Sequence, residues 1–313
     1  KDAQFEMTDF LYKKHKKLRS YNPKPEISDN SISDACRLIN KAKKPFIIFG
    51  QGVILANAEE EFRVLMEKTG IPSAWTILGL SAVATDHPLN VGMVGMHGNY
   101  GPNVLTNECD LLIAVGMRFD DRVTGNLNHY AKQAKIIHLE IDPAEINKNV
   151  KVDVAVLGDL KNTLPKIIEK VEIKKHEKWL QKFRDLNQIE YDKVIKDDLF
   201  PKKEKISMGE VIHHINIATN GNAIIVTDVG QHQMVACRYA KFNESKSNIT
   251  SGGLGTMGFA LPAAIGAKMG APKREVIAVI GDGGFQMTIQ ELGTIFQTGV
   301  PVKIVVLNND FLG

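Results

Sequence analysis

The chain has 313 residues, of which 43% are hydrophobic and 24% are charged. This composition is typical of globular proteins and excludes disorder, collagen and coiled coil, and the length predicts two domains. The net charge is only +3, which favours small-molecule chemistry over nucleic-acid binding. No apolar run approaches the roughly 18 residues of a membrane span, so we expect no membrane association.

Three cysteines, Cys36, Cys109 and Cys237, are far apart and fit no metal-binding spacing. We interpret them as reduced residues of a cytoplasmic protein, or of an organellar one if the source is eukaryotic. The chain begins without an initiator methionine or a signal-peptide hydrophobic region, so we expect it to be an excerpt of something longer.

Residues 1–30 show no sustained apolar periodicity and are predicted to be a linker. Five basic residues gather in this segment. They favour a solvated helix face over a phosphate-binding patch. These residues are Lys13, Lys14, Lys16, Lys17 and Arg19.

Residues 31–172 are predicted to form an α/β domain. Apolar strands alternate with amphipathic helices and break into loops, mostly glycine-containing, at their carboxyl ends. The predicted strands are 45–49, 73–77, 111–115, 136–141 and 154–157. This alternation indicates a doubly wound parallel sheet with its ligand crevice at those carboxyl ends.

The helical spacing of apolar residues between Trp179 and Ile189 predicts an inter-domain helix and linker over 173–205. Alternation resumes over 206–313, with strands at 223–227, 276–280 and 302–307 and a glycine-rich loop at 251–258. The fold class is therefore α/β with two doubly wound parallel-sheet domains. The chain stops directly after what the pattern predicts to be a central strand, so we expect the second domain to be truncated.

Polar residues follow two neighbouring strands of this second domain. Gly281-Asp282-Gly283-Gly284 follows one strand and Asn308-Asn309 the next. Carboxylate and carboxamide oxygens at one sheet edge suit Mg²⁺ shared with a diphosphate, which the glycine N–H groups and the following helix would approach. The alternative is that Asp282 and Asn309 merely cap a helix and a turn.

Gly-Asp-Gly, 24 intervening residues and Asn-Asn resemble the thiamine diphosphate signature. The flanking sequence is similar to the acetolactate synthase (acetohydroxyacid synthase) family, catalytic large subunit. The segments that carry this resemblance are 94–98, 116–125, 141–146, 229–234, 251–259 and 261–267.

The resemblance implies a thiamine diphosphate and Mg²⁺ site. Asp282, Asn309 and the main-chain carbonyl of Phe311 would bind Mg²⁺, and Met257 would lie beneath the cofactor and bend it. The residues implied to hold thiamine diphosphate are Val229, Gly230, Gln231, His232, Gly255, Met257, Asp282, Gly283, Gly284, Asn309, Phe311, Leu312 and Gly313.

The resemblance also implies that 31–172 is a dinucleotide-binding-like middle domain, which carries FAD without a net redox role. The residues alone leave FAD, NAD and an empty relic fold open. The chain departs from the family at two positions. It has Gln51 where the family often has a glycine, and it has Glu140 where the family often has an acidic residue that is one methylene shorter. The residues implied to line the FAD site are Gln51, Gly52, Thr76, Ile77, Val94, Gly95, Met96, His97, Gly116, Met117, Arg118, Phe119, Asp120, Glu140, Ile141, Asp159 and Leu160.

The reaction implied is decarboxylation of pyruvate and carboligation to a second 2-oxo acid, pyruvate or 2-oxobutyrate, in branched-chain amino acid biosynthesis. The products would be 2-acetolactate or 2-aceto-2-hydroxybutyrate. The cofactor supplies the electron sink. We expect Arg122 to bind the acceptor carboxylate and Met96 to contact its alkyl group. The alternative for Arg122 is a salt bridge with Asp120 or Asp121.

The family site spans two subunits, so the resemblance implies a homodimer or tetramer, and it leaves a small regulatory subunit open. In the family, an N-terminal domain supplies the glutamate that protonates N1′ of the aminopyrimidine. A tryptophan-bearing segment that favours 2-oxobutyrate as acceptor follows the position of Gly313. Neither lies within these 313 residues. We therefore expect this chain alone to be inactive.

Two other functions stay open. One is another thiamine diphosphate-dependent decarboxylase, oxidase or carboligase, which the run at 118–125 disfavours. The other is a non-catalytic nucleotide-binding domain, against which the intact Asp282 and Asn309 argue.

Overall fold

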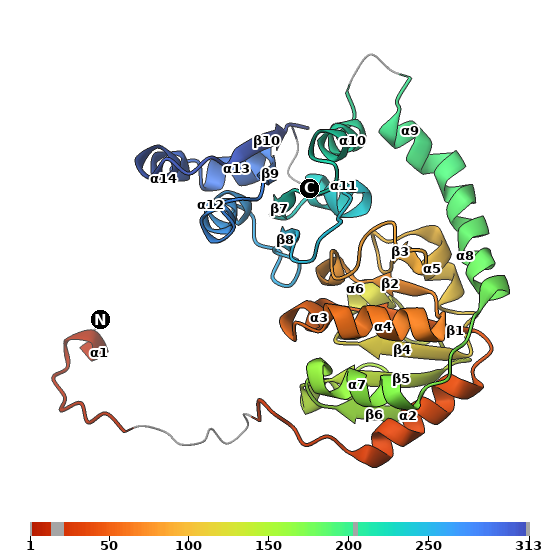
Figure 1. Cartoon of the computed structure of the whole chain (residues 1–313). Helices are drawn as coiled ribbons and strands as arrows, with labels where there is room; N and C mark the ends of the chain where they lie inside the picture. Colours follow the sequence, from red (N-terminus) through yellow and green to blue (C-terminus); the bar gives the residue numbers. More distant parts are fainter. Residues whose placement is uncertain (1, 14–21, 203–205, 311–313) are drawn as a thin grey trace.

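The computed structural model describes residues 2–13, 22–202 and 206–310. The first described element is the short helix α1 (Asp2–Phe5), near the N-terminal end of the chain (Figure 1). The described part of the predicted linker is otherwise without regular structure until α2 (Asp29–Lys41). Four of the five basic residues lie outside the described residues, and Lys13 is exposed.

The middle domain contains a six-stranded sheet in the order β3-β2-β1-β4-β5-β6, and all its strand pairs are parallel. Its strands are β1 (Pro45–Phe49), β2 (Ser73–Trp75), β3 (Asn90–Met93), β4 (Leu111–Val115), β5 (Lys135–Glu140) and β6 (Val154–Leu157). The prediction of a doubly wound parallel sheet is confirmed. The edge strand β3 was not predicted, because asparagine and glycine are poor strand formers.

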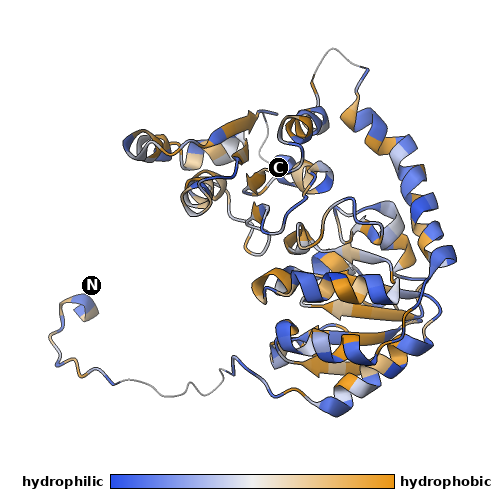
Figure 2. Ribbon diagram, in the orientation of Figure 1, coloured by the Kyte–Doolittle hydropathy of each residue, from blue (hydrophilic) through white to orange (hydrophobic). Residues whose placement is uncertain are grey.

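Helices cover both faces of this sheet. They are α2, α3 (Gln51–Leu55), α4 (Glu59–Thr69), α5 (Tyr100–Leu105), α6 (Asp121–Thr124) and α7 (Leu160–Lys170), with the 3-10 turns η1 (Ile77–Gly79) and η2 (Pro143–Glu145). The central strands β1 and β4 are buried along their whole length. Figure 2 shows the strands as hydrophobic and much of the outer helix surface as hydrophilic. Continuous apolar strands of this kind are typical of a sheet that is covered on both faces.

A long helical segment leads from the middle domain to the second domain along one side of the molecule (Figure 1). It consists of α8 (Glu177–Glu190), the π-helical η3 (Tyr191–Ile195) and α9 (Lys196–Leu199). The Trp179 indole donates to the Pro45 carbonyl at 2.9 Å, and Phe183 stacks against Phe46 at 5.0 Å. The helix that we predicted as inter-domain therefore packs into the middle-domain core.

The C-terminal domain contains a four-stranded parallel sheet in the order β10-β9-β7-β8. Its elements are α10 (Met208–Thr219), β7 (Ile224–Thr227), α11 (Gln231–Tyr239), β8 (Asn248–Thr250), α12 (Ala260–Gly270), β9 (Val276–Gly281), α13 (Asp282–Met287), α14 (Glu291–Thr298) and β10 (Lys303–Leu307). The short β8 was not predicted. The strand predicted at 302–307 is present as β10, which lies at the edge of the four described strands; its central place in a larger sheet stays a prediction.

The two domains are joined by hydrogen bonds that backbone N–H groups donate to carbonyl and hydroxyl oxygens. Thr85 N donates to the Phe242 carbonyl at 2.8 Å, and Phe242 N donates to the Thr85 hydroxyl at 2.8 Å. Ser247 N donates to the Ser81 hydroxyl at 3.1 Å. One hydrophobic cluster also includes buried residues of both sheets. The domains thus have a fixed relation to each other. Across the described ranges, no helix has both the length and the apolar character needed to cross a bilayer.

Candidate functional site

A cavity of about 210 Å³ lies at the carboxyl ends of β7, β9 and β10. It is lined by Met208, Val229, Gly230, Gln231, His232, Met257, Gly281, Asp282, Gly283, Gly284, Leu307 and Asn309. We call it the smaller cavity. In a parallel sheet the carboxyl ends of neighbouring strands face one crevice, so residues far apart in sequence meet there.

The start of α11 forms one wall of the smaller cavity. Gly230 has a φ of 139°, a conformation that residues with a side chain rarely adopt. It turns the chain from β7 into the nine-residue helix α11, whose first residues are Gln231 and His232. Unpaired N–H groups at a helix start are suited to bind phosphate oxygens.

Asp228 lies completely buried beneath this wall. Its Oδ1 contacts Nε2 of His232, and its Oδ2 accepts a hydrogen bond from Gly258 N at 2.9 Å. This carboxylate therefore joins the end of β7, helix α11 and the loop that carries Met257. Sequence reasoning did not single out Asp228, although its position four residues before His232 is a usable signal.

Two glycines of the Gly-Asp-Gly-Gly segment pack directly on this pair. A Cβ at Gly284 would lie 2.0 Å from Oδ2 of Asp228, and one at Gly281 would lie 2.8 Å from Nδ1 of His232. A side chain at either position would collide with the cavity floor. Glycine at these positions is therefore required by packing.

The predicted metal ligands lie at the ends of adjacent strands. Asp282 follows β9 and Asn309 follows β10, and the two strands pair in register with Gly281 opposite Leu307. Asn309 Nδ2 also donates to Oε1 of Gln231 at 3.0 Å. Within the described ranges, no three His, Cys, Asp or Glu side chains gather as a metal site. One carboxylate and one carboxamide suit Mg²⁺ that takes its other ligands from phosphate and water.

Three of the predicted residues, Phe311, Leu312 and Gly313, lie outside the described residues. Met257, the predicted wedge, lines the smaller cavity. Gly255 lines a second cavity instead, and Val229 lies between the two. Met208 and Leu307 complete the apolar lining of the smaller cavity. They were not predicted, because nothing in the sequence distinguishes them from core residues.

The second cavity, of about 700 Å³, lies between the two domains, and we call it the larger cavity. From the middle domain it is lined by Gly50, Gln51, Gly52, Leu55, Thr76, Ile77, Leu78, Met93, Val94, Gly95, Met96, His97, Gly116, Met117, Arg118, Asp120, Asp121, Arg122, Val123, Glu140 and Ile141. From the C-terminal domain it is lined by Val229, Gln233, Ser251, Gly252, Gly253, Leu254 and Gly255. Most of the residues expected to line the FAD site meet here. The C-terminal contribution was largely missed, because the sequence does not show how the domains face each other.

Three residues of the expected FAD site lie away from the cavity wall. Phe119 is buried in the core, edge-on to His138 at 5.0 Å. Asp159 caps α7 by accepting from Lys161 N at 2.8 Å. Leu160 is buried beneath Gly116. Burial of an apolar side chain explains the position of Phe119 and Leu160, and helix capping explains that of Asp159.

A close contact of glycines shapes the larger cavity. A Cβ at Gly52 would lie 2.6 Å from Cα of Gly116, whose φ is 56°. Gln51, between Gly50 and Gly52, lies exposed on the wall. The Glu140 carboxylate accepts from Ile141 N at 2.8 Å. Both residues that depart from the family pattern therefore fit without blocking the cavity.

Arg122 and Met96 lie together on the wall. The Arg122 guanidinium is 3.9 Å from the Met96 sulfur, and Met96 N donates to the Arg122 carbonyl at 2.8 Å. Asp120 pairs with Arg118 instead, at 3.8 Å. Among the described residues, the alternative of a salt bridge from Arg122 to Asp120 or Asp121 is not observed. Burial lowers the pKa of the neighbouring His97, and the charges of Arg122 and Arg238 lower it further, which favours a neutral imidazole.

Comparison with protein families gives two matches. Residues 32–167 match the thiamine pyrophosphate enzyme central domain. Residues 228–313 match the thiamine pyrophosphate enzyme C-terminal TPP binding domain. The chain belongs to the thiamine pyrophosphate enzymes. The second match begins at Asp228, the residue beneath the smaller cavity.

Curated relatives of this thiamine pyrophosphate enzyme are acetolactate synthase large subunits. That of Buchnera aphidicola subsp. Schizaphis graminum is 41% identical over 312 residues, covering 97% of the chain and 53% of the relative. A probable one from Methanocaldococcus jannaschii is 44% identical, covering 95% and 51%. Isozyme 3 of Escherichia coli is 39% identical, covering 95% and 52%. The chain thus spans about half the length of the curated relatives it matches.

Proposed function

We propose that this chain provides the diphosphate-binding and flavin-binding parts of an acetolactate synthase large subunit. The proposed reaction is decarboxylation of pyruvate and carboligation to a second 2-oxo acid in branched-chain amino acid biosynthesis. One observation carries the proposal. A cavity that joins Asp282, Asn309 and the start of α11 lies beside one that contains Arg122 and Met96. The similarity to acetolactate synthase large subunits supports it.

At the smaller cavity, the chain's residues are proposed to bind and orient thiamine diphosphate. The N–H groups at the start of α11 and in the Gly283-Gly284 backbone would hold the diphosphate. Asp282 and Asn309 would ligate Mg²⁺. Met257 would support the cofactor from below, since a flexible thioether fills an irregular gap. The bound cofactor supplies an electron sink for the carbon chemistry.

At the larger cavity, FAD is the proposed resident group and the acceptor 2-oxo acid the proposed neighbour. The volume of about 700 Å³ is within the usual range for ligand sites. Arg122 would bind the acceptor carboxylate, since a planar guanidinium matches a carboxylate in two parallel hydrogen bonds. Met96, in contact with Arg122, would lie against the small alkyl group and thereby influence acceptor choice.

The assembly and location are also proposals. We propose a small regulatory subunit as a partner, because the relatives are named large subunits. We also propose a homodimer or tetramer, because the site of the family that the sequence resembles spans two subunits. The three cysteines are free and buried, as expected in a reducing compartment such as the cytoplasm or an organelle interior.

The test is a pair of cofactor titrations. We expect thiamine diphosphate to bind only with Mg²⁺ present, and FAD to bind independently and give a flavin absorbance spectrum. Asp282→Ala should abolish the Mg²⁺-dependent binding and leave FAD affinity unchanged. Asp142→Ala, an exposed aspartate of the middle domain, is the matched control. Unchanged diphosphate affinity in Asp282→Ala would remove the metal assignment.

A further inference from the structure

A partly buried ion pair joins the two domains beside the larger cavity. Arg238, in the last turn of α11, contacts Oε1 of Glu190 at the end of α8 through its Nη2. The Glu190 side chain is only 7% exposed and that of Arg238 is 18% exposed. Charges that are this well buried need partners. The question is what the pair holds in place.

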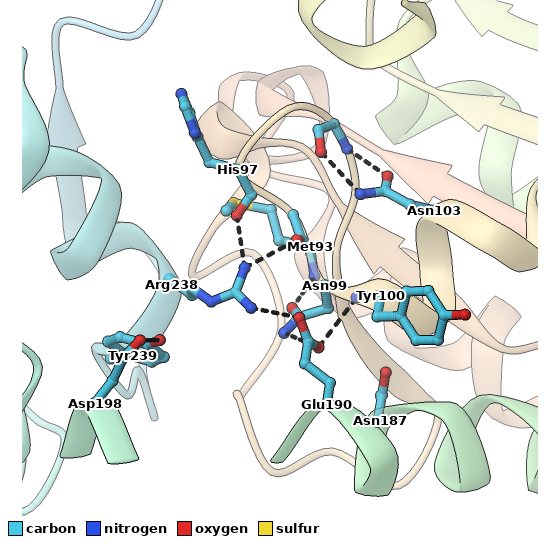
Figure 3. Close-up of polar contacts among 12 residues, drawn as sticks. Met93, His97, Asn99, Tyr100, Asn103, Asn187, Glu190, Asp198, Arg238 and Tyr239 are labelled. Carbon is cyan, nitrogen blue, oxygen red and sulfur yellow. Dashed lines mark hydrogen bonds and ion pairs between the residues drawn. The ribbon is translucent and has the colours of Figure 1, made fainter. Parts of the chain in front are cut away.

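Both members of the pair also bind the segment of residues 94–99, which we call the cavity loop. Arg238 Nη1 donates to the Gly98 carbonyl at 2.9 Å and to the His97 carbonyl at 3.3 Å. Oε2 of Glu190 accepts from Asn99 Nδ2 at 3.1 Å and from Tyr100 N at 3.0 Å. One guanidinium and one carboxylate thus hold the loop at successive residues (Figure 3).

The rest of the cavity loop is fixed within the middle domain. Asn103 forms two hydrogen bonds of 2.9 Å with the backbone of Gly95. The Met93 N donates to the Asn99 side chain at 2.9 Å. Only Arg238 reaches the loop from the C-terminal domain among the side-chain hydrogen bonds of the described residues. The pair therefore sets where the loop lies relative to that domain.

Helix α11 connects the ion pair of Arg238 and Glu190 to both cavities. Its first turn carries Gln231 and His232 on the smaller cavity. Its last turn carries Arg238, which holds the loop that presents Met96 and His97 to the larger cavity. Nine residues of α-helix span about 13 Å, so one rigid element connects the two walls.

We propose that Arg238 and Glu190 are positioning residues that hold the cavity loop, and with it Met96 and His97, at the flavin and acceptor site. The proposal rests on the proposed function for the identity of the ligand. Neither residue lines either cavity, so both act through the loop. The two carbonyls that Arg238 binds belong to the loop, so loss of this one side chain should loosen the wall.

The experiment uses the full 313-residue chain with FAD, and with thiamine diphosphate plus Mg²⁺, as separate probes. We expect Arg238→Met to weaken FAD binding and to speed amide hydrogen exchange in residues 94–99, each about tenfold. The affinity for thiamine diphosphate should stay within about twofold of the wild-type value, because the start of α11 still lines the smaller cavity. Arg184→Met, an exposed arginine on α8, is the matched control.

A second set of variants separates positioning from stability. Arg238→Met leaves a buried carboxylate unpaired and lowers the melting temperature. Adding Glu190→Gln removes that charge and should restore the melting temperature, but the His97 and Gly98 carbonyls still lack their donor. FAD affinity should therefore stay low in the double variant. Arg238→Lys, which keeps the positive charge but lacks the planar guanidinium, should retain only part of the FAD affinity.

The outcomes distinguish this inference from the proposed function. FAD affinity that recovers with the melting temperature in the double variant would overturn the positioning role. So would unchanged exchange of residues 94–99 in Arg238→Met. If the wild-type chain binds no FAD, the proposed flavin site is wrong, while the exchange measurement still decides whether the pair holds the loop.

Discussion

Asp228 and His232 form a buried pair at the floor of the smaller cavity, with Nε2 of His232 against Oδ1 of Asp228. The contact fixes the orientation of the imidazole ring, because the other carboxylate oxygen is itself held by Gly258 N at 2.9 Å. Nδ1 is therefore directed toward the backbone of Gly281. The hydrogen bond at one ring nitrogen sets the orientation of an imidazole, and here the partner is the fully buried carboxylate of Asp228.

Replacing this carboxylate should loosen the cavity. Asp228→Asn places an amide NH₂ either against Gly258 N, which then loses its acceptor, or against the His232 ring, which must then change tautomer or lose its partner. We expect a loss of about 1–3 kcal/mol in unfolding free energy and weaker binding of thiamine diphosphate with Mg²⁺. Urea unfolding and a cofactor titration measure the two effects. Asp159→Ala, which removes the N-cap of α7 in the middle domain, should reduce stability without changing thiamine diphosphate affinity.

Two glycines should respond in opposite ways to alanine. At Gly284 a Cβ would lie 2.0 Å from Oδ2 of Asp228, whereas at Gly293 in α14 nothing lies within 4 Å. We expect Gly284→Ala to destabilise the chain by about 1–3 kcal/mol and to impair diphosphate binding. Gly293→Ala should stabilise it by about 0.5–1 kcal/mol. Equal melting temperatures for the two variants would contradict the close packing at Gly284.

Two histidines should make the chain less stable as the pH falls. Burial lowers the pKa of His97 and of His176, and nearby positive charges add to the effect. The unfolded state, with a histidine pKa near 6.5, then binds more protons than the folded state. The stabilisation is complete above about pH 6.5 and is lost progressively below it. We expect a lower urea midpoint at about pH 5.5 than at about pH 7.5. His97→Asn and His176→Asn should each reduce this difference, and a difference that neither variant reduces would argue against this origin.

The buried cysteines should resist thiol reagents in the folded chain. Burial raises the pKa of Cys109 and of Cys237 to about 12 and also raises the pKa of Cys36. Because the thiolate is the reactive form, we expect no appreciable labelling by a disulfide reagent at neutral pH before unfolding. All three thiols should react in denaturant. Rapid labelling of the native chain would show that local opening exposes them.

The sequence predicted the parallel sheets well, because their central strands are buried on both faces. Runs such as Pro45–Phe49 and Leu111–Val115 contain almost nothing but apolar residues, and such runs admit few other interpretations. Edge strands gave weaker signals. β3 contains Asn90 and Gly92, and its pairing with β2 is irregular, so its existence depends on tertiary contacts that a local pattern does not contain.

The candidate site was predictable where a polar residue directly follows a strand, as Asp282 and Asn309 do. It was less predictable where residues act through packing. Phe119 lies next to polar cavity residues in the sequence, but its side chain points into the core. Arg238 and Glu190 are 48 residues apart and belong to different domains. Nothing in their local sequence indicates that they meet, because the meeting depends on how the two sheets face each other.

The larger cavity takes its walls from both domains, and this has a calorimetric consequence. A ligand bound there contacts Gly116 and Gly252 surfaces at once, so it binds only when both domains are folded and docked. Its binding free energy then adds to the cohesion between the domains. We expect the unliganded chain to unfold in two steps on heating. The ligand-saturated chain should unfold in one cooperative transition at a higher temperature.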